Sequence, residues 1–371
     1  MNTTNHQNDN RVVSIDAMRT IALFGIIVLN YHGYLNFSGA LSSTEPSIYE
    51  RWWHPFDGVL ANPFPVGFVM VAGMGVSLMT STMNTKQLIT ETRWRLARRG
   101  LFLFTLGYGI EWIWRGTILP YYGVLFLAAS VIAYWSKRNL VLLGVFSIVV
   151  AAAVESWRFA ETFNDNFTIW LSPAEPDSPR NLLIRIFIDY THPLFPWLAF
   201  FITGILLGRN YATFKTIRFR LLIICVGVVS FSYLANAMIH SLANSSSQTD
   251  QSLRQLASTR PFDRGILYVA SAIGVVIAVL VVLHILCERY KNSPIIETAR
   301  ITGQMTLTIY LAHIFIFNTV VNKLELVTPT GLDTAMIMSI AVYASAIIWA
   351  NWWHNRFGRG PAEIVYRRFG G

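Results

Sequence analysis

One histidine of this sequence stands near a carboxylate at a spacing that suits proton transfer. His54 follows the pair Trp52 and Trp53, and Asp57 comes three residues later. A neutral imidazole accepts a proton from a hydroxyl or an amine, and a nearby carboxylate orients the ring. His54 and Asp57 therefore predict a general base and its orienting partner. The alternative is a loop that the two tryptophans anchor at a membrane surface, with no chemical role for His54.

A second polar pair ends a long apolar stretch. Asn30 and His32 follow the apolar residues of 20–29. An amide side chain stabilises a developing oxyanion, which is the role predicted for Asn30. His32 competes with His54 for the role of base. The alternative for Asn30 is a hydrogen bond that packs one helix against another.

Basic residues mark a third candidate site. Asp16 and Arg19 are spaced i,i+3, and Arg95 and Arg99 are spaced i,i+4, so each pair shares one helix face. The cluster of Arg93, Arg95, Arg98 and Arg99 predicts a site that binds phosphates through paired hydrogen bonds. Asp16 and Arg19 predict a binding-site ion pair at the cytoplasmic mouth of the first helix. The alternatives are a structural clamp for the first pair and a topological signal for the arginines.

The composition indicates a protein of the membrane. Of 371 residues, 53% are hydrophobic and 13% are charged, whereas soluble domains carry about 25% charged residues. The net charge of +9 is therefore assigned to membrane orientation rather than to nucleic acid. Cys225 and Cys287 are expected to be buried thiols. The sequence lacks a phosphate-binding glycine loop, a His-Glu-x-x-His metal motif and a nucleophile elbow, so no metal is predicted.

Apolar segments predict an all-α, polytopic membrane bundle of about ten helices, because each crossing needs roughly 20 apolar residues. The expected segments are 17–35, 63–82, 97–114, 118–135, 139–157, 193–209, 217–240, 262–287, 301–322 and 334–355. We expect one domain over 1–371, with cytoplasmic tails at 1–16 and 356–371. The first segment is interpreted as a retained helix rather than a signal peptide.

The distribution of basic residues predicts the orientation. With both termini inside, 20 of the 29 Lys and Arg residues lie on the inner side. Every inside connection then carries at least two of them, which is the positive-inside pattern. The long connections fall outside. Of these, 158–192 is expected to be an ordered loop or surface cap, and 241–259 a mobile loop.

Three stretches resemble the bacterial YeiB family. They are RVVSIDAMRTIALFGIIVLN at 11–30, GQMTLTIYL at 303–311 and RFGRGPAEIVYRR at 356–368. Together they span nearly the whole chain. The biochemical role of that family is poorly defined.

The opening stretch also resembles the heparan-α-glucosaminide N-acetyltransferase family. In that family an Asp-x-x-Arg opening leads to a helix ending in Asn-Tyr, then to a loop with a catalytic His and a Phe-Pro-rich helix. This chain matches these features with Asp16, Arg19, Asn30, Tyr31 and His54, with FPVGFVMVAG at 64–73 and with HPLFPWLAFFITG at 192–204. The loop between Asn30 and His54 is longer than in the family, which keeps His32 as a rival.

This resemblance implies a transmembrane acyltransferase of the bacterial inner membrane. It would move an acyl group from cytoplasmic acyl-CoA, acetyl-CoA above all, to a sugar or glycolipid of the cell envelope. The residues implied to bind the co-substrate are Asp16, Arg19, Arg95, Arg98 and Arg99. The implied catalytic residues are His54 with Asn30 and Asp57, and His32 as the rival base.

Two other functional classes stay open. A transporter or flippase for an envelope precursor also needs a cavity lined by His, Asn and Arg, but it consumes no acyl-CoA. In a scaffold protein the polar cluster would be structural. The expected partners are membrane lipid and a glycan or glycolipid acceptor, and not nucleic acid; a homo-oligomer stays open.

Overall fold

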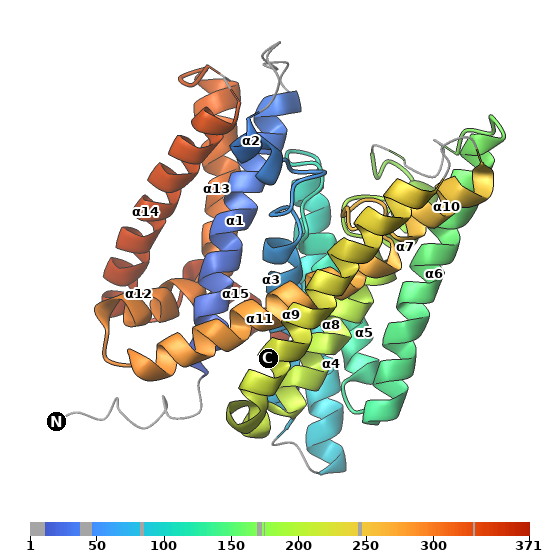
Figure 1. The fold of residues 1–371 in the computed structure, drawn as a ribbon. Coiled ribbons are helices and arrows are strands. Elements are labelled where there is room, and N and C mark those ends of the chain that lie inside the picture. The colour runs from blue at the N-terminus through green and yellow to red at the C-terminus, as the bar shows by residue number, and fades with distance from the viewer. Residues whose placement is uncertain are drawn as a thin grey trace.

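The described residues of the protein form a bundle of helices (Figure 1). The structure is a computed structural model that describes residues 12–37, 47–81, 85–168, 173, 175–243, 247–328 and 331–371. Within these ranges every regular element is a helix. The predicted all-α, polytopic helical fold is confirmed.

Each of the ten predicted segments coincides with helical structure. The elements are α1 (Val13–Phe37), α3 (Pro63–Thr80), α4 (Lys86–Glu111), α5 (Leu119–Ile132), α6 (Lys137–Phe163), α8 (Leu194–Arg209), α9 (Tyr211–Leu242), α11 (Ile266–Arg289), α12 (Pro294–Gly303), α13 (Thr306–Phe317) continued by the π-helix η2 (Asn318–Lys323), and α14 (Leu332–Phe357). Side chains before the first turn cap several of them. For example, Thr85 Oγ1 accepts from the Leu88 N–H at the start of α4, which pairs an otherwise free donor.

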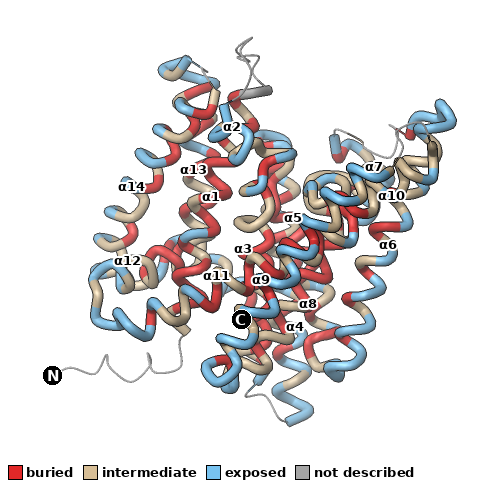
Figure 2. The backbone as a smooth tube through the Cα atoms, in the orientation of Figure 1, coloured by how far each residue is buried: buried red, intermediate tan, exposed pale blue. Residues whose placement is uncertain are grey.

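Six of the described helices are long and apolar enough to cross a bilayer, and the α12–α13 pair is a seventh candidate. The helices α5 and α8 are apolar but shorter. The central helix α1 has 67% of its apolar window buried, whereas α9 has 11%. Figure 2 shows the buried residues gathered in the middle of the bundle and exposed ones along α6, α9 and α14. Apolar side chains such as Ile223 and Ile348 point outward, as lipid contact requires. The count of ten spans remains a prediction.

The ninth predicted segment, 301–322, is wrong as one continuous helix. It is broken between α12 and α13, whose axes differ by 75°. The break follows Gly303, the last residue of α12, where a Cβ would overlap the backbone of Asp16 in α1. Close backbone approach of this kind is available only to glycine. The end of α12 thus packs against the end of α1 that we predict to be cytoplasmic.

Small residues also set the contacts between the central helices. The closely packed pairs are α3 with α8, α4 with α5, and α9 with α11. A Cβ on Gly204 of α8 would overlap the Met70 carbonyl oxygen of α3. Helices in lipid associate through such close packing, because lipid supplies no hydrophobic drive between them.

The connections that were predicted outside lie together at one end of the bundle. There the chain forms α2 (Ile48–Trp52), α7 (Pro179–Phe187) and α10 (Gln248–Leu256), at the upper end in Figure 1. The expected mobile loop at 241–259 is therefore wrong over α10, which hydrogen bonds hold in place. Arg254 donates to the His240 carbonyl at 3.0 Å, and Gln255 donates to the Glu155 carbonyl of α6 at 3.3 Å.

The predicted C-terminal tail contains a helix, α15 (Pro361–Gly370), which packs on α4 and α13. Its Glu363 carboxylate accepts from Leu307 N–H at 2.7 Å and from the Thr308 hydroxyl at 2.6 Å. A carboxylate at a helix N-terminus pairs the free amides there, so α15 is tied to the first turn of α13. Residues 1–11 of the predicted N-terminal tail lie outside the described residues.

The predicted orientation is testable with single cysteines. With Cys225 and Cys287 replaced by alanine, a cysteine at Asn166 should react with a membrane-impermeant maleimide added to intact cells. A cysteine at Thr85, in the basic connection before α4, should react only after the cells are lysed. Labelling of Thr85→Cys in intact cells would contradict the inside placement of that connection.

Candidate active site

A cavity of about 480 Å³ lies between α1, α3, α4, α5, α13 and α15. Arg19, Arg95 and Arg99 line it, together with Tyr366 and Arg367 of α15. We call it the arginine cavity. Three of the five residues predicted to bind acyl-CoA thus share one space.

Two of the arginines in the arginine cavity, Arg95 and Arg99, are incompletely paired within the described residues. Arg95 makes no hydrogen bond or ion pair there, and the Nε atoms of Arg95 and Arg99 are buried without a partner. Arg99 lies 5.3 Å from the Tyr366 ring and donates to Met79 Sδ at 3.2 Å. Buried donors are nearly always paired, and these two Nε atoms are exceptions in the described part of the chain.

The other two predicted residues lie beside this cavity rather than on it. Asp16 pairs with Arg19, with Oδ1 2.8 Å from Nη1. Arg98 points to the end of α15 and donates to the Gly370 carbonyl at 3.2 Å. Arg95 and Arg99 line the cavity, whereas Arg98 does not, although its i,i+3 spacing from Arg95 allows a shared helix face.

The arginine cavity also contains residues that sequence reasoning did not single out. They are Gln304 and Tyr310 from the α12–α13 region and Glu363, Tyr366 and Arg367 from α15. Burial raises the pKa of the Glu363 carboxyl. All five fall in the two C-terminal stretches that resemble the YeiB family, and this resemblance was the available signal.

A second cavity, of about 150 Å³, lies toward the end of the bundle that carries α2 and α7. Asn30, Tyr34 and His192 line it, with Arg115 and Arg264. We call it the asparagine cavity. Asn30 is the only member of this set that was predicted as a site residue.

Asn30 is held by a histidine far away in the sequence. Its Nδ2 lies 3.2 Å from His313 Nε2, and Tyr31 donates to the His313 carbonyl at 2.9 Å. His313 Nδ1 contacts the Tyr310 carbonyl; since a carbonyl only accepts, Nδ1 carries the ring hydrogen and Nε2 accepts from Asn30. Among the described residues, the Asn30 carboxamide makes no other hydrogen bond, and it lines the asparagine cavity.

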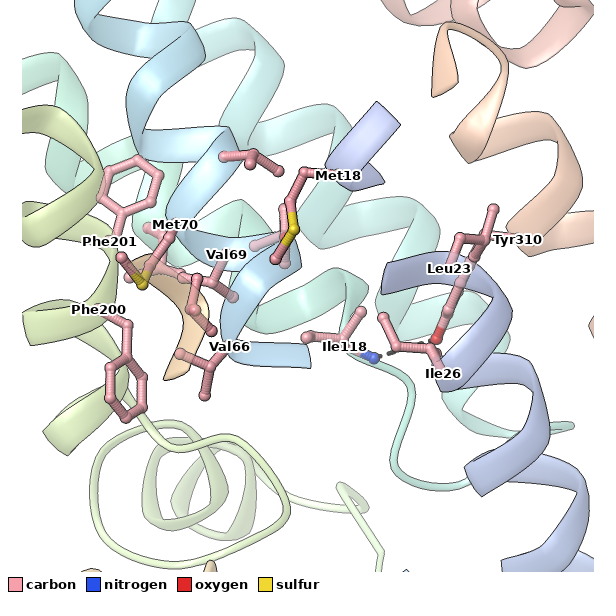
Figure 3. Close-up of a cluster of buried hydrophobic side chains, with 14 of the residues drawn as sticks. Met18, Leu23, Ile26, Val66, Val69, Met70, Ile118, Phe200, Phe201 and Tyr310 are labelled. Carbon is pink, nitrogen blue, oxygen red and sulfur yellow. Dashed lines mark hydrogen bonds between the residues drawn. The ribbon is translucent and has the colours of Figure 1, made fainter. Parts of the chain in front are cut away.

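Two side chains separate the cavities. Ile118 and Tyr310 line both of them, and we call this pair the septum. The Tyr310 hydroxyl accepts from the Ile118 N–H at 3.3 Å and lies 3.0 Å from the Thr117 hydroxyl. In Figure 3, Ile118 lies between Val66 and Ile26, and the Tyr310 hydroxyl reaches toward the Ile118 N–H from beside Leu23.

His54 and Asp57 lie next to the asparagine cavity but do not line it. Their neighbours Pro55 and Phe56 do. The His54 side chain is 40% exposed, with Nδ1 3.7 Å from an Asp57 carboxylate oxygen. In this arrangement Nδ1 accepts from the Asp57 backbone N–H at 3.1 Å. The hydrogen of the neutral ring is then on Nε2.

His32 is buried, at 4% exposure. Its Nδ1 donates to the Trp53 carbonyl at 3.0 Å, which leaves the lone pair on Nε2 as a base requires. Its ring centre is 6.5 Å from that of His54. The structure thus brings both candidate bases together beside the cavity that contains Asn30: His54 is accessible, and His32 has the tautomer of a base.

One residue that lines the asparagine cavity, Arg264, belongs to a network of ion pairs that the sequence did not indicate. Arg264 donates to Glu155 at 2.7 Å, and behind it Arg158 pairs with Asp189 at 2.6 Å. The Glu155 carboxylate compensates the buried charge of Arg264, which makes its burial tolerable.

Comparison with known families agrees with this geometry. The family model described as "Heparan-alpha-glucosaminide N-acetyltransferase, catalytic" matches residues 11–244, which include Asn30, both candidate bases and Arg99. The chain belongs to the heparan-alpha-glucosaminide N-acetyltransferase catalytic family. A second family model, "Protein of unknown function (DUF418)", matches residues 210–370 and confirms the YeiB-type resemblance. None of the curated proteins that were compared matches the chain.

Membership of this family makes the protein an acetyltransferase-type membrane protein. The N-terminal family match supplies Asn30 and the arginines of α4. The DUF418 match supplies Tyr310 of the septum and the α15 wall of the arginine cavity. The two matched regions therefore meet at the cavities.

Proposed function

We propose that the protein transfers an acyl group, acetyl in the first place, from cytoplasmic acyl-CoA to a sugar or glycolipid on the opposite side of the bacterial inner membrane. One observation carries the proposal: an arginine-lined cavity and a cavity with Asn30 lie toward opposite ends of the bundle, and only the septum of Ile118 and Tyr310 is shared by both.

The donor would enter the arginine cavity. The planar guanidinium groups of Arg95 and Arg99 carry paired N–H donors whose geometry matches two phosphate oxygens. Arg19 adds a third positive charge, which the Asp16 carboxylate partly compensates. The phosphates of acyl-CoA would stay at these residues. The uncharged pantetheine arm would extend past the septum, where Tyr310 would have to leave the Thr117 hydroxyl and the Ile118 N–H.

The acceptor would meet the thioester in the asparagine cavity. His54 at its edge would take the proton of the attacking hydroxyl or amine. For this its Nδ1 would turn from the Asp57 backbone N–H to the carboxylate of the same residue, 3.7 Å away. Catalytic hydrogen bonds are often loose before substrate binds. Asn30 would stabilise the oxyanion with its remaining N–H.

A transporter is the second candidate, because two cavities across a thin septum also suit alternating access. Consumption of acyl-CoA separates the two functions. Proteoliposomes with uniform orientation should receive acetyl-CoA on the α15 side and glucosamine, the sugar unit in the family's name, on the α2 side. We expect N-acetylglucosamine on the α2 side and an equal amount of free CoA thiol on the α15 side. Recovery of intact acetyl-CoA would contradict an acyltransferase and favour the transporter.

A further inference from the structure

A histidine outside the predicted site faces the asparagine cavity. His192 lies between α7 and α8 and lines the same cavity as Asn30. Its ring packs edge-on against Trp197 at 4.6 Å and lies 5.8 Å from the Tyr121 ring. These contacts fix the plane of the imidazole without using its nitrogen atoms.

One ring nitrogen of His192 is unpaired among the described residues. Nδ1 is buried and has no hydrogen-bond partner among the described residues. Buried polar atoms without a partner are rare and call for an explanation. Because the ring borders a cavity that already contains Asn30, the missing partner is expected to be a ligand atom.

The surroundings of His192 keep the imidazole neutral. Burial lowers its pKa to about 3, and the Arg264 guanidinium contributes to the shift. The groups that face it are Arg264 from the α10–α11 connection, Tyr121 of α5 and Tyr268 of α11. A ring with so low a pKa is a poor proton acceptor near pH 7. It is a suitable neutral hydrogen-bond donor, because it keeps its N–H while charge develops on an acceptor.

We propose that His192 donates a hydrogen bond to the carbonyl oxygen of the acyl thioester in the asparagine cavity, as a second oxyanion donor beside Asn30. This inference rests on the proposed function. It separates two tasks between histidines: His54 moves the proton, and His192 polarises the carbonyl.

In the proposed acyl transfer, the acceptor nitrogen or oxygen attacks the thioester carbon, and its proton passes to the base. The carbonyl oxygen gains negative charge, which His192 and Asn30 stabilise. The carbon–sulfur bond then breaks, the carbonyl re-forms, and the base returns the proton to sulfur as free CoA thiol. His192 keeps its own hydrogen throughout.

The test uses the full-length protein in lipid nanodiscs with acetyl-CoA labelled with ¹³C at the carbonyl and with glucosamine. Bound to the wild type, the carbonyl should absorb at lower infrared frequency than in water, because a donor polarises it. His192→Ala should lose that shift and lower kcat by about 10² to 10³, with the affinity for acetyl-CoA and the acid limb of the pH–rate profile unchanged. His192→Gln, which retains an N–H donor, should recover part of the infrared shift and part of kcat. His240→Gln, on α9 and away from both cavities, is the matched control.

The outcomes separate this inference from the proposed function. If His192→Ala leaves both the carbonyl band and the rate unchanged, the proposed role of His192 is overturned. Loss of the acid limb in His192→Gln would also overturn it, because His192 would then be the base. If His192→Ala does not fold, the infrared shift in His192→Gln decides. If acetyl-CoA binds but no acetyl group is transferred, the infrared frequency of the bound carbonyl can still be measured. A wild type that does not bind acetyl-CoA overturns the proposed function and this inference together.

Discussion

Replacing His54 by alanine should lower the rate of acyl transfer by about 10² to 10⁴-fold, the usual contribution of a general base. The affinity for acyl-CoA should not change, because the phosphates would lie in the arginine cavity and His54 lies beside the other one. The measurements are kcat from release of CoA thiol and Kd from calorimetry, each on the purified protein.

The pH dependence supplies an independent reading. A base must be unprotonated to accept a proton, so the wild-type rate should fall toward acid pH. The residual rate of His54→Ala should lack this acid limb. Asp57→Asn should lower the rate less than His54→Ala, because it removes an orienting group, 58% exposed, and not the base itself.

His32 is the matched comparison, since it lies 6.5 Å from His54 and differs in burial and tautomer. His32→Ala should have the smaller effect on kcat. An inactive His32→Ala with an active His54→Ala would transfer the role of base to His32 and leave the reaction class in place. Full activity in both variants would contradict histidine base catalysis at this end of the bundle.

Replacing Arg95 or Arg99 by alanine should each weaken acyl-CoA binding by about 1.5 to 3 kcal/mol, the range for hydrogen bonds to charged groups. This corresponds to about a 10- to 150-fold higher Kd. Both residues line the arginine cavity, and their Nε atoms lack partners in the described part of the protein. Binding should also weaken as salt is added, because exposed charge pairs are screened.

Arg98→Ala is the control for this prediction. It removes the same charge from the same helix, but Arg98 bonds to Gly370 and does not line the cavity. Its Kd for acyl-CoA should stay close to that of the wild type. Equal losses in Arg95→Ala and Arg98→Ala would mean that net positive charge on α4, rather than the cavity, attracts the ligand. Maleimide labelling at Thr85→Cys checks that each variant keeps the orientation of α4.

The sequence alone determined most of the long helices, the membrane class and one face of α4, but not the short helices α10 and α15 or the break between α12 and α13. Hydropathy and charge are properties of contiguous residues, and the i,i+4 spacing of Arg95 and Arg99 fixes their common direction within a helix. The resemblance to the acetyltransferase family supplied the predicted roles of Asn30 and His54, and the family match confirms the relationship on which these roles rest.

Only the tertiary structure decided which side chains share a cavity. Asn30 meets His313 across 283 residues, and the septum joins Ile118 to Tyr310. The bend at Gly303 depends on how closely α12 approaches α1. His192 is distinguished from the other histidines only by the cavity beside it. In lipid these arrangements follow from interhelical shape and polar contacts between segments far apart in the chain, and no local pattern of residues encodes such contacts.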